Sequence, residues 1–228
     1  MARSVILYSG GMDSFCLSKM VPEADLLFIE TGTGDNQHEK LRLPDYVKQV
    51  KMNLSAWELE NKIIPFRNCF FVLAAAQMYS DIYLGATAGD TTKDKDYVFK
   101  AMMESMMNYF GLDDHKMGHT ARPFIIHMPF KNKTKTEIVK LFLEYGNDPI
   151  SLAQESRSCY EDSHDQECGR CRACLRKFIA FFNNDIQSYI QFQHEPSKLE
   201  LEAFLLESQR KGRGREAAEI EFALLKYK

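Results

Sequence analysis

The residues best placed to do chemistry lie near the start of the chain, where residues 9–14 read Ser-Gly-Gly-Met-Asp-Ser. The adjacent glycines Gly10 and Gly11 allow backbone conformations closed to other residues and let the chain come close to an anion. A helix expected from about Asp13 would present free N–H groups and the positive end of its dipole to the same anion. The string therefore predicts a phosphate-binding loop in which the two serine hydroxyls donate to phosphate oxygens.

Two familiar phosphate motifs do not account for this loop. No Gly-Lys-Ser/Thr follows it, so it is not a Walker A loop, and the third glycine of a dinucleotide fingerprint is missing. Taken alone, the residues leave one alternative, a tight turn in which Asp13 or Ser14 caps the helix.

Four of the six cysteines form a second cluster. Cys159 is followed by eight residues and then by Cys168, Cys171 and Cys174, and the two overlapping C-x2-C steps place three thiolates around one point. Gly169 permits the knuckle turn between them. Four thiolates fill a tetrahedral shell, so the spacing predicts a closed, structural zinc site without catalysis. An iron–sulfur cluster and four free thiols are the alternatives.

Short apolar runs alternate with helical patterns along the chain. Such alternation implies a parallel sheet with helices on both faces and ligands beyond the carboxyl ends of the strands. We expect an α/β fold, a doubly wound parallel sheet at residues 1–146, with a small zinc-binding helical appendage at residues 147–228. Expected strands are 4–8, 25–29, 82–85 and 123–127, with a short extended piece at 61–65; expected helices are 13–20, one within 34–52, 66–79, 96–109, 133–145, 175–193, 198–209 and 216–228, and residues 147–176 are expected to be loop-like.

Composition narrows the partners and the compartment. The net charge of -3 supplies no positive field for a phosphate backbone, which argues against a nucleic-acid partner. No apolar run approaches the roughly 18 residues of a membrane span, and no secretory signal is recognisable. We therefore expect a cytoplasmic protein, in which reduced thiols favour metal over disulfides. Cys16 and Cys69 lie in expected helices and are interpreted as buried bystanders.

The loop resembles the signature of the PP-loop, or N-type ATP pyrophosphatase, superfamily. Loop and cysteine cluster together resemble one family within it, the 7-cyano-7-deazaguanine synthases of queuosine and archaeosine precursor synthesis. That family's pattern continues with Arg-Asn opening a helix, then Pro-x5-Lys-x-Glu, then Cys-Tyr followed by Cys-Gly-x-Cys-x-x-Cys. The resemblance runs from about Val5 to Lys177, and the residues that carry it here are Arg67, Asn68, Pro129, Lys135, Glu137, Cys159, Tyr160, Cys168, Gly169, Cys171 and Cys174.

The resemblance implies an ATP-dependent ligase with magnesium bound beside ATP and a structural zinc. ATP would adenylate 7-carboxy-7-deazaguanine, ammonia would attack, and the amide would be adenylated again and dehydrated to the nitrile. The implied residues are, for catalysis, Asp13, Arg67, Asp90 and Lys135; for ATP binding, Tyr8, Ser9, Gly10, Gly11, Met12, Asp13, Ser14, Arg67 and Asn68; and for zinc, Cys159, Cys168, Cys171 and Cys174.

Simpler explanations exist for several of these residues. Arg67 could form a surface salt bridge, Lys135 could be a solvated lysine at a helix start, and Asp90 could cap a turn or helix. Asp94 and Asp96 are candidates to accept the N–H donors of a guanine-like substrate, or belong to a charge-balanced turn.

The chain departs from the family pattern in several places, and Leu175 and Arg176 follow the last cysteine one residue sooner than is usual. Phe66 stands before Arg67, where the family usually has glycine. An insertion before that point is mostly absent, and residues 90–96 replace the family's Gly-Tyr-Pro-Asp-Cys-Arg segment, which puts the exact substrate in doubt. A PP-loop ligase for a different carboxylate, a tRNA-modifying PP-loop enzyme and a non-catalytic nucleotide-binding protein are the alternatives. The amphipathic tail after residue 184 lies outside the resemblance and is a candidate homodimer contact.

Overall fold

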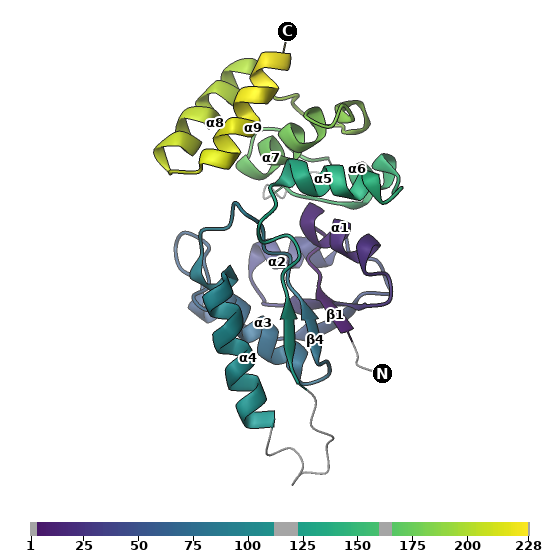
Figure 1. The fold of residues 1–228 in the computed structure, drawn as a ribbon, viewed down its shortest axis with the longest axis vertical. Coiled ribbons are helices and arrows are strands. Elements are labelled where there is room, and N and C mark those ends of the chain that lie inside the picture. The colour runs from purple at the N-terminus through teal and green to yellow at the C-terminus, as the bar shows by residue number, and fades with distance from the viewer. Residues whose placement is uncertain (1–3, 112–122, 160–165, 228) are drawn as a thin grey trace. The chain divides into compact units, whose positions relative to one another are not determined.

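The computed structural model describes residues 4–111, 123–159 and 166–227 (Figure 1). The chain forms two compact units, and neither is a continuous stretch of sequence. The first comprises Met1–Ser9, Val21–Ala86 and Asp90–Lys131, and the second Gly10–Met20, Thr87–Gly89 and Asn132–Lys228. The domain boundary expected after residue 146, between an ATP-binding domain and a zinc-binding helical region, stays a prediction. Within the described ranges, no helix is both long enough and apolar enough to cross a bilayer.

The first unit contains a five-stranded sheet in which every pair of neighbouring strands is parallel. The strand order is β3-β2-β1-β4-β5, which reverses direction at β1 and is the order of a doubly wound sheet. The predicted α/β class is therefore confirmed. The strands are β1 (Ser4–Leu7), β2 (Asp25–Glu30), β3 (Lys48–Lys51), β4 (Asp81–Tyr83) and β5 (Ile125–His127).

Two helices, α3 (Arg67–Ala76) and α4 (Tyr97–Gly111), supply the core against this sheet. Val5 and Leu27 from the strands are buried in one cluster with Val72 of α3 and with buried residues of α4. The remaining elements of this unit are the helix α2 (Gly34–Lys40) and the single 3-10 turns η1 (Ser55–Trp57) and η2 (Lys93–Lys95).

The second unit is helical. Helix α1 (Met12–Met20) packs on α5 (Lys135–Glu144), where the Phe15 and Phe142 rings lie 6.1 Å apart. A hairpin of α8 (Lys198–Arg210) and α9 (Gly214–Lys226) packs on α7 (Arg172–Phe182) (Figure 1). Phe178, Leu201 and Ile220 are central to that contact. Helix α6 (Pro149–Glu155) and the 3-10 turn η4 (Gln187–Tyr189) complete the unit.

Several sequence predictions of elements were wrong. β3 was missed because its residues are polar and mostly exposed, as an edge strand allows. α6 was missed although Asp148 caps it and proline occupies its first turn. The helix predicted at 175–193 starts earlier and ends at residue 182, where the Asn184 side chain donates to a helix carbonyl and Asp185 takes a left-handed backbone. The piece expected to be extended at 61–65 forms no strand; it has turns at both ends and irregular backbone between them.

Phe66 is a site of backbone strain. It precedes α3 with φ 59° and ψ 19°, the left-handed region that bulky side chains rarely adopt. Its ring is 71% exposed, so little burial compensates for the conformation. The family pattern has glycine at this position, which adopts such a backbone without cost.

We expect Phe66→Gly to raise the free energy of unfolding by about 1 kcal/mol, because glycine removes the left-handed strain while little buried surface is lost. Phe66→Ala is the matched control, because alanine loses the ring but keeps the Cβ. Denaturant unfolding of both variants measures the difference. A glycine variant no more stable than the alanine variant would contradict the assignment of strain.

Candidate functional site

The predicted phosphate loop has the backbone that its glycines suggested. Gly10 has φ +73°, and the Gly11 carbonyl accepts the Phe15 N–H at 2.9 Å, which opens α1. The Ser14 hydroxyl also donates to the Gly11 carbonyl, at 3.0 Å, and this hydrogen bond joins two residues of the loop. Of the other predicted ATP-binding residues here, Tyr8 and Met12 are buried and Ser9 is exposed.

Asp13 and Lys135, predicted separately as catalytic, lie together. The Lys135 ammonium is 2.7 Å and 2.6 Å from the two carboxylate oxygens of Asp13. Both side chains are only about a quarter exposed, at 25% and 22%. Thr134 caps α5 directly before the lysine, in a capping box with Glu137. The pair therefore sets a carboxylate and an ammonium on two helix starts, next to the phosphate loop.

Three other predicted residues lie in the first unit. Arg67 is exposed at the start of α3, with its guanidinium 5.8 Å from the centre of the Phe71 ring. Asn68 is buried, and its side-chain amide donates to Asp94 at 2.9 Å. The same carboxylate oxygen accepts the Asn68 backbone N–H at 3.3 Å, so Asp94 satisfies a donor at the start of α3. The predicted ATP-binding and substrate residues thus meet each other.

The remaining acids of the segment 90–96, Asp90 and Asp96, also have partners. Lys95 donates to Asp90 at 3.1 Å, and Asp96 accepts the Phe99 N–H at 2.8 Å at the start of α4. Lys93 lies 3.9 Å from Asp96 but is almost fully exposed, so that pair contributes little. The segment contains three aspartates and two lysines, and the carboxylates already use some of their lone pairs in these hydrogen bonds. Roles of Asp90, Asp94 and Asp96 in catalysis or substrate binding stay predictions.

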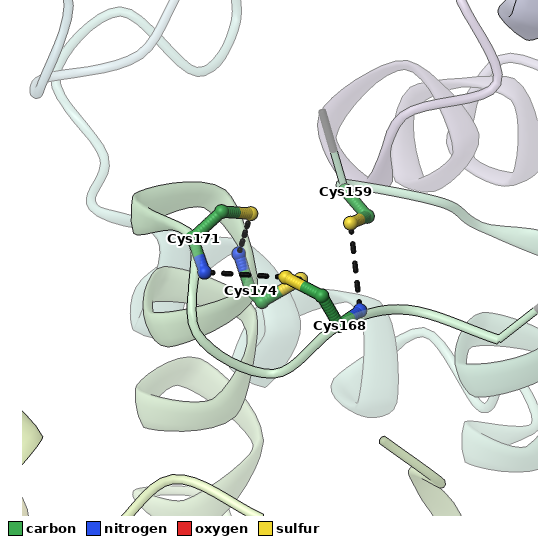
Figure 2. A group of neighbouring side chains, drawn as sticks. All are labelled: Cys159, Cys168, Cys171 and Cys174. Carbon is green, nitrogen blue, oxygen red and sulfur yellow. Dashed lines mark hydrogen bonds between the residues drawn. The ribbon is translucent and has the colours of Figure 1, made fainter. Parts of the chain in front are cut away.

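The four predicted metal ligands converge (Figure 2). Their sulfur atoms all lie within 4.8 Å of one another. Tetrahedral zinc with Zn–S bonds of about 2.3 Å would separate its sulfurs by about 3.8 Å. The Cys168 and Cys174 sulfurs are 3.9 Å apart, so the cluster fits such an ion with little movement. Cys159 enters from a separate stretch of chain, whereas Cys171 caps α7.

Backbone N–H groups and burial shape the charge of this cluster. The Cys168 sulfur accepts the N–H of Arg170 at 3.4 Å and of Cys171 at 3.3 Å. Hydrogen bonding with Cys171 and burial raise the pKa of the Cys174 thiol in the metal-free protein. A bound cation would reverse that balance, because a coordinating thiol is deprotonated. The cluster can therefore hold a metal ion.

Gly169 makes the knuckle turn possible. It has φ +77°, and a Cβ at this position would lie 1.7 Å from the carbonyl oxygen of His194. A β-bridge between Glu167 and Phe192 holds the two chain segments close together beside this turn. No other residue could occupy this position without moving the turn that carries Cys168 and Cys171.

A buried carboxylate supports the fourth ligand. One oxygen of Glu167 accepts the backbone N–H groups of Ser158 at 2.6 Å and of Cys159 at 3.2 Å. Its other oxygen lies 2.6 Å from the Lys177 ammonium. Glu167 thereby holds the segment that delivers Cys159 to the cluster, although sequence reasoning did not single it out.

Lys177 is the partner of that carboxylate and is fully buried. Besides Glu167, its ammonium donates to the carbonyls of Ser156 at 2.7 Å and Ala153 at 3.3 Å. A signal for it exists in the sequence, because a lysine on the apolar face of α7, three residues after Cys174, needs a buried partner.

The same segment reaches the phosphate loop. Arg157 directly follows Ser156, whose carbonyl binds Lys177, and precedes Cys159 by two residues. Its backbone N–H donates to the Gly10 carbonyl at 2.9 Å. The metal cluster and the phosphate loop are therefore linked through three consecutive residues, 157–159. No spacing in the sequence indicates this contact.

Neither cysteine outside the cluster is suited to nucleophilic chemistry. Cys16 is fully buried, and burial raises the pKa of its thiol far above the ordinary range. Burial also raises the pKa of the half-buried Cys69 thiol. Both therefore stay protonated, and a thiol is a poor nucleophile.

Comparison with known proteins gives a consistent result. A family model described as "Queuosine biosynthesis protein QueC" matches residues 36–185. A protein of Rickettsia rickettsii (strain Sheila Smith) named "7-cyano-7-deazaguanine synthase" is 31% identical over 83% of this chain and 98% of its own length. A protein of the same name in Rickettsia bellii (strain OSU 85-389) is 28% identical over 84% of this chain and 99% of its own.

One solved structure is a weaker match. It is described as "predicted subunit of tRNA methyltransferase from Methanocaldococcus jannaschii DSM", with a TM-score of 0.44 and 15% identity over 63% of this chain and 75% of that one.

We expect the protein to bind one zinc ion per chain and Gly169→Ala to lose it. The left-handed backbone alone should cost about 1–3 kcal/mol, and the contact with the His194 carbonyl adds to that. Gly212→Ala is the matched control, since Gly212 has φ +66° and no atom near its Cβ position. Elemental analysis and thermal unfolding measure both effects. Full zinc in Gly169→Ala, or iron in the native protein, would contradict this account.

Proposed function

The chain belongs to the QueC family of queuosine biosynthesis proteins, and from this premise we propose that it is an ATP-dependent ligase that makes 7-cyano-7-deazaguanine from 7-carboxy-7-deazaguanine and ammonia. ATP transfers AMP to the carboxylate and releases pyrophosphate. Ammonia displaces AMP to give the amide, and adenylation of the amide oxygen by a second ATP allows loss of AMP to leave the nitrile. The observation that carries the proposal is the Asp13–Lys135 pair beside a phosphate loop with a left-handed Gly10.

The phosphate loop would hold the pyrophosphate part of ATP. The backbone N–H groups at a helix N-terminus point toward a bound anion, and the helix dipole favours negative charge there, so the start of α1 suits a phosphate. Asp13, in the first turn of α1, would help hold magnesium when ATP is bound, since a carboxylate with phosphate oxygens is the usual magnesium environment. Ser9 is exposed, so burial does not prevent its hydroxyl from contacting a phosphate.

Lys135 would stabilise the charge that develops during adenylation. Its ammonium is fixed by Asp13 and by the capped start of α5, so it needs little reorganisation when negative charge builds up. Arg67 is our second candidate for neutralising the substrate carboxylate or the α-phosphate, since a guanidinium matches either group. Asn68 would position the start of α3 for that contact through its bonds to Asp94.

We further propose that the metal is zinc and structural. Four cysteine sulfurs leave no open position for water or substrate. A site of four thiolates requires reduced cysteines, which suits the cytoplasm. Magnesium would accompany ATP, and no step of the chemistry involves the zinc.

Substrate recognition is assigned to the segment 90–96. A carboxylate can accept from several donors at once, so the hydrogen bonds that these acids make do not exclude a further donor from a substrate. Asp94 and Asp96 would accept N–H groups of the guanine-like edge, and Asp90, held by Lys95, would act in catalysis. The altered segment also makes a ligase acting on a different carboxylate the second candidate.

A thiolating tRNA enzyme is disfavoured by the cysteines. Such chemistry needs an accessible thiolate, whereas burial keeps Cys16 and Cys69 protonated. A non-catalytic nucleotide-binding protein is supported only by the change in the segment 90–96. The hairpin of α8 and α9, with exposed leucines such as Leu199 and Leu225, remains our candidate for a homodimer contact.

We expect Asp13→Asn to lower the rate of AMP formation by about 100-fold or more, because it removes a magnesium ligand and leaves Lys135 without its carboxylate. Ser9→Ala should weaken ATP binding. Asp45→Asn, at an exposed position outside the loop, is the matched control and should keep full activity. The assay follows AMP release from ATP with 7-carboxy-7-deazaguanine and ammonia. Full activity in both loop variants would rule out the loop as the ATP site.

A further inference from the structure

Helix α9 lies beyond residue 185, where the match to the QueC family ends, and yet it contacts the element that carries Lys135. Its side chains reach the residues around the start of α5, 78 and more positions earlier in the chain. These contacts are not needed for the packing of α9 itself, which buries Ala217, Ile220 and Ala223.

Arg215 makes the first of these contacts. One guanidinium nitrogen donates to the Asn132 carbonyl at 2.6 Å, and the other lies 2.7 Å from both carboxylate oxygens of Glu137. Burial alone would raise the pKa of Glu137, but the Thr134 N–H and Arg215 outweigh it and hold that pKa below its usual value. Glu137 is therefore an anion in the folded protein, and Arg215 of α9 forms an ion pair with it.

Glu219 makes the second contact, one helical turn further along α9. Its carboxylate accepts a short hydrogen bond from the Thr134 hydroxyl, the group that caps α5. The Glu219 backbone carbonyl in turn accepts from the Asn183 side chain at 3.0 Å, which ties this turn of α9 to the end of α7. Thr134 and Glu137 form the capping box around Lys135, so α9 contacts both members of the box.

We propose that α9 is a clamp that positions Lys135 for catalysis, with Arg215 and Glu219 as positioning residues. The inference rests on the proposed function, because Lys135 acts there on the adenylation step. By fixing residues 134 and 137 on either side, the clamp holds the lysine where it meets Asp13. A displacement of about 1 Å at such a group can lower a rate about 100-fold.

The kinetic test is a double-mutant cycle in the full-length protein. Arg215→Ala should lower kcat for AMP formation about 10- to 100-fold with little change in the KM for ATP. Because Arg215 acts through Lys135, the variant Arg215→Ala with Lys135→Ala should be no slower than Lys135→Ala alone. Arg210→Ala, on an exposed arginine of α8, is the matched control and should leave kcat unchanged.

A second variant covers the case that Arg215→Ala does not fold. Arg215→Lys keeps the charge but loses the two-pronged contact, so it should fold and show a smaller fall in kcat. Unchanged kcat in the Arg215 variants, or rate losses that multiply in the double variant, would overturn the clamp.

Hydrogen exchange separates this inference from the proposed function. The amides of residues 135–138 should exchange faster in Arg215→Ala than in the native protein or in Arg210→Ala, because the capping box loses its support. Native protein that forms no AMP would contradict the proposed function, and the clamp would then be decided by exchange alone. Unchanged exchange in Arg215→Ala would overturn it.

Discussion

Lys177 places a positive charge where no water reaches it, on the helix that contains Cys174 and is capped by Cys171. Taking an ammonium out of water costs several kcal/mol, so it is stable there only with partners that replace the solvent. Glu167 and the carbonyls of Ser156 and Ala153 fill that role. The Lys177 ammonium therefore holds Ala153, Ser156 and Glu167 together, and Glu167 in turn holds the backbone of Ser158 and Cys159.

These contacts connect the cysteine cluster with the predicted phosphate loop. Cys159 is one of the four clustered cysteines, and two residues earlier the Arg157 N–H donates to the Gly10 carbonyl. The two features therefore depend on the same short segment, residues 157–159. From another direction, α9 holds the start of α5 through Thr134 and its capping box, and so places the lysine that pairs with Asp13. The Asp13–Lys135 pair is therefore supported near α1 by the segment that Lys177 holds, and at the start of α5 by α9.

The local features that could be predicted from the sequence depend on residues that lie close together in the chain. The glycines of the phosphate loop and the cysteine knuckle depend on neighbours within a few residues, and the parallel sheet follows from the alternation of strand and helix patterns. The structure confirms the α/β class and the clustering of the cysteines. Contacts between distant segments could not be predicted, such as Asn68 with Asp94 or Arg157 with Gly10, since many partners would satisfy the same donors. For Lys177 the sequence shows a charge on an apolar helix face, which indicates that a buried partner exists. It does not show that this partner is Glu167.

The central claim is that this chain activates a 7-deazaguanine carboxylate with ATP. The most direct measurement incubates the native protein with ATP, magnesium, 7-carboxy-7-deazaguanine and ¹⁵N-labelled ammonium, and follows products by mass spectrometry. We predict 7-cyano-7-deazaguanine with one ¹⁵N atom in the nitrile, together with AMP and pyrophosphate. Release of AMP with no labelled amide or nitrile, while another carboxylate is converted, would contradict the substrate, and no AMP with any acid would contradict the account as a whole.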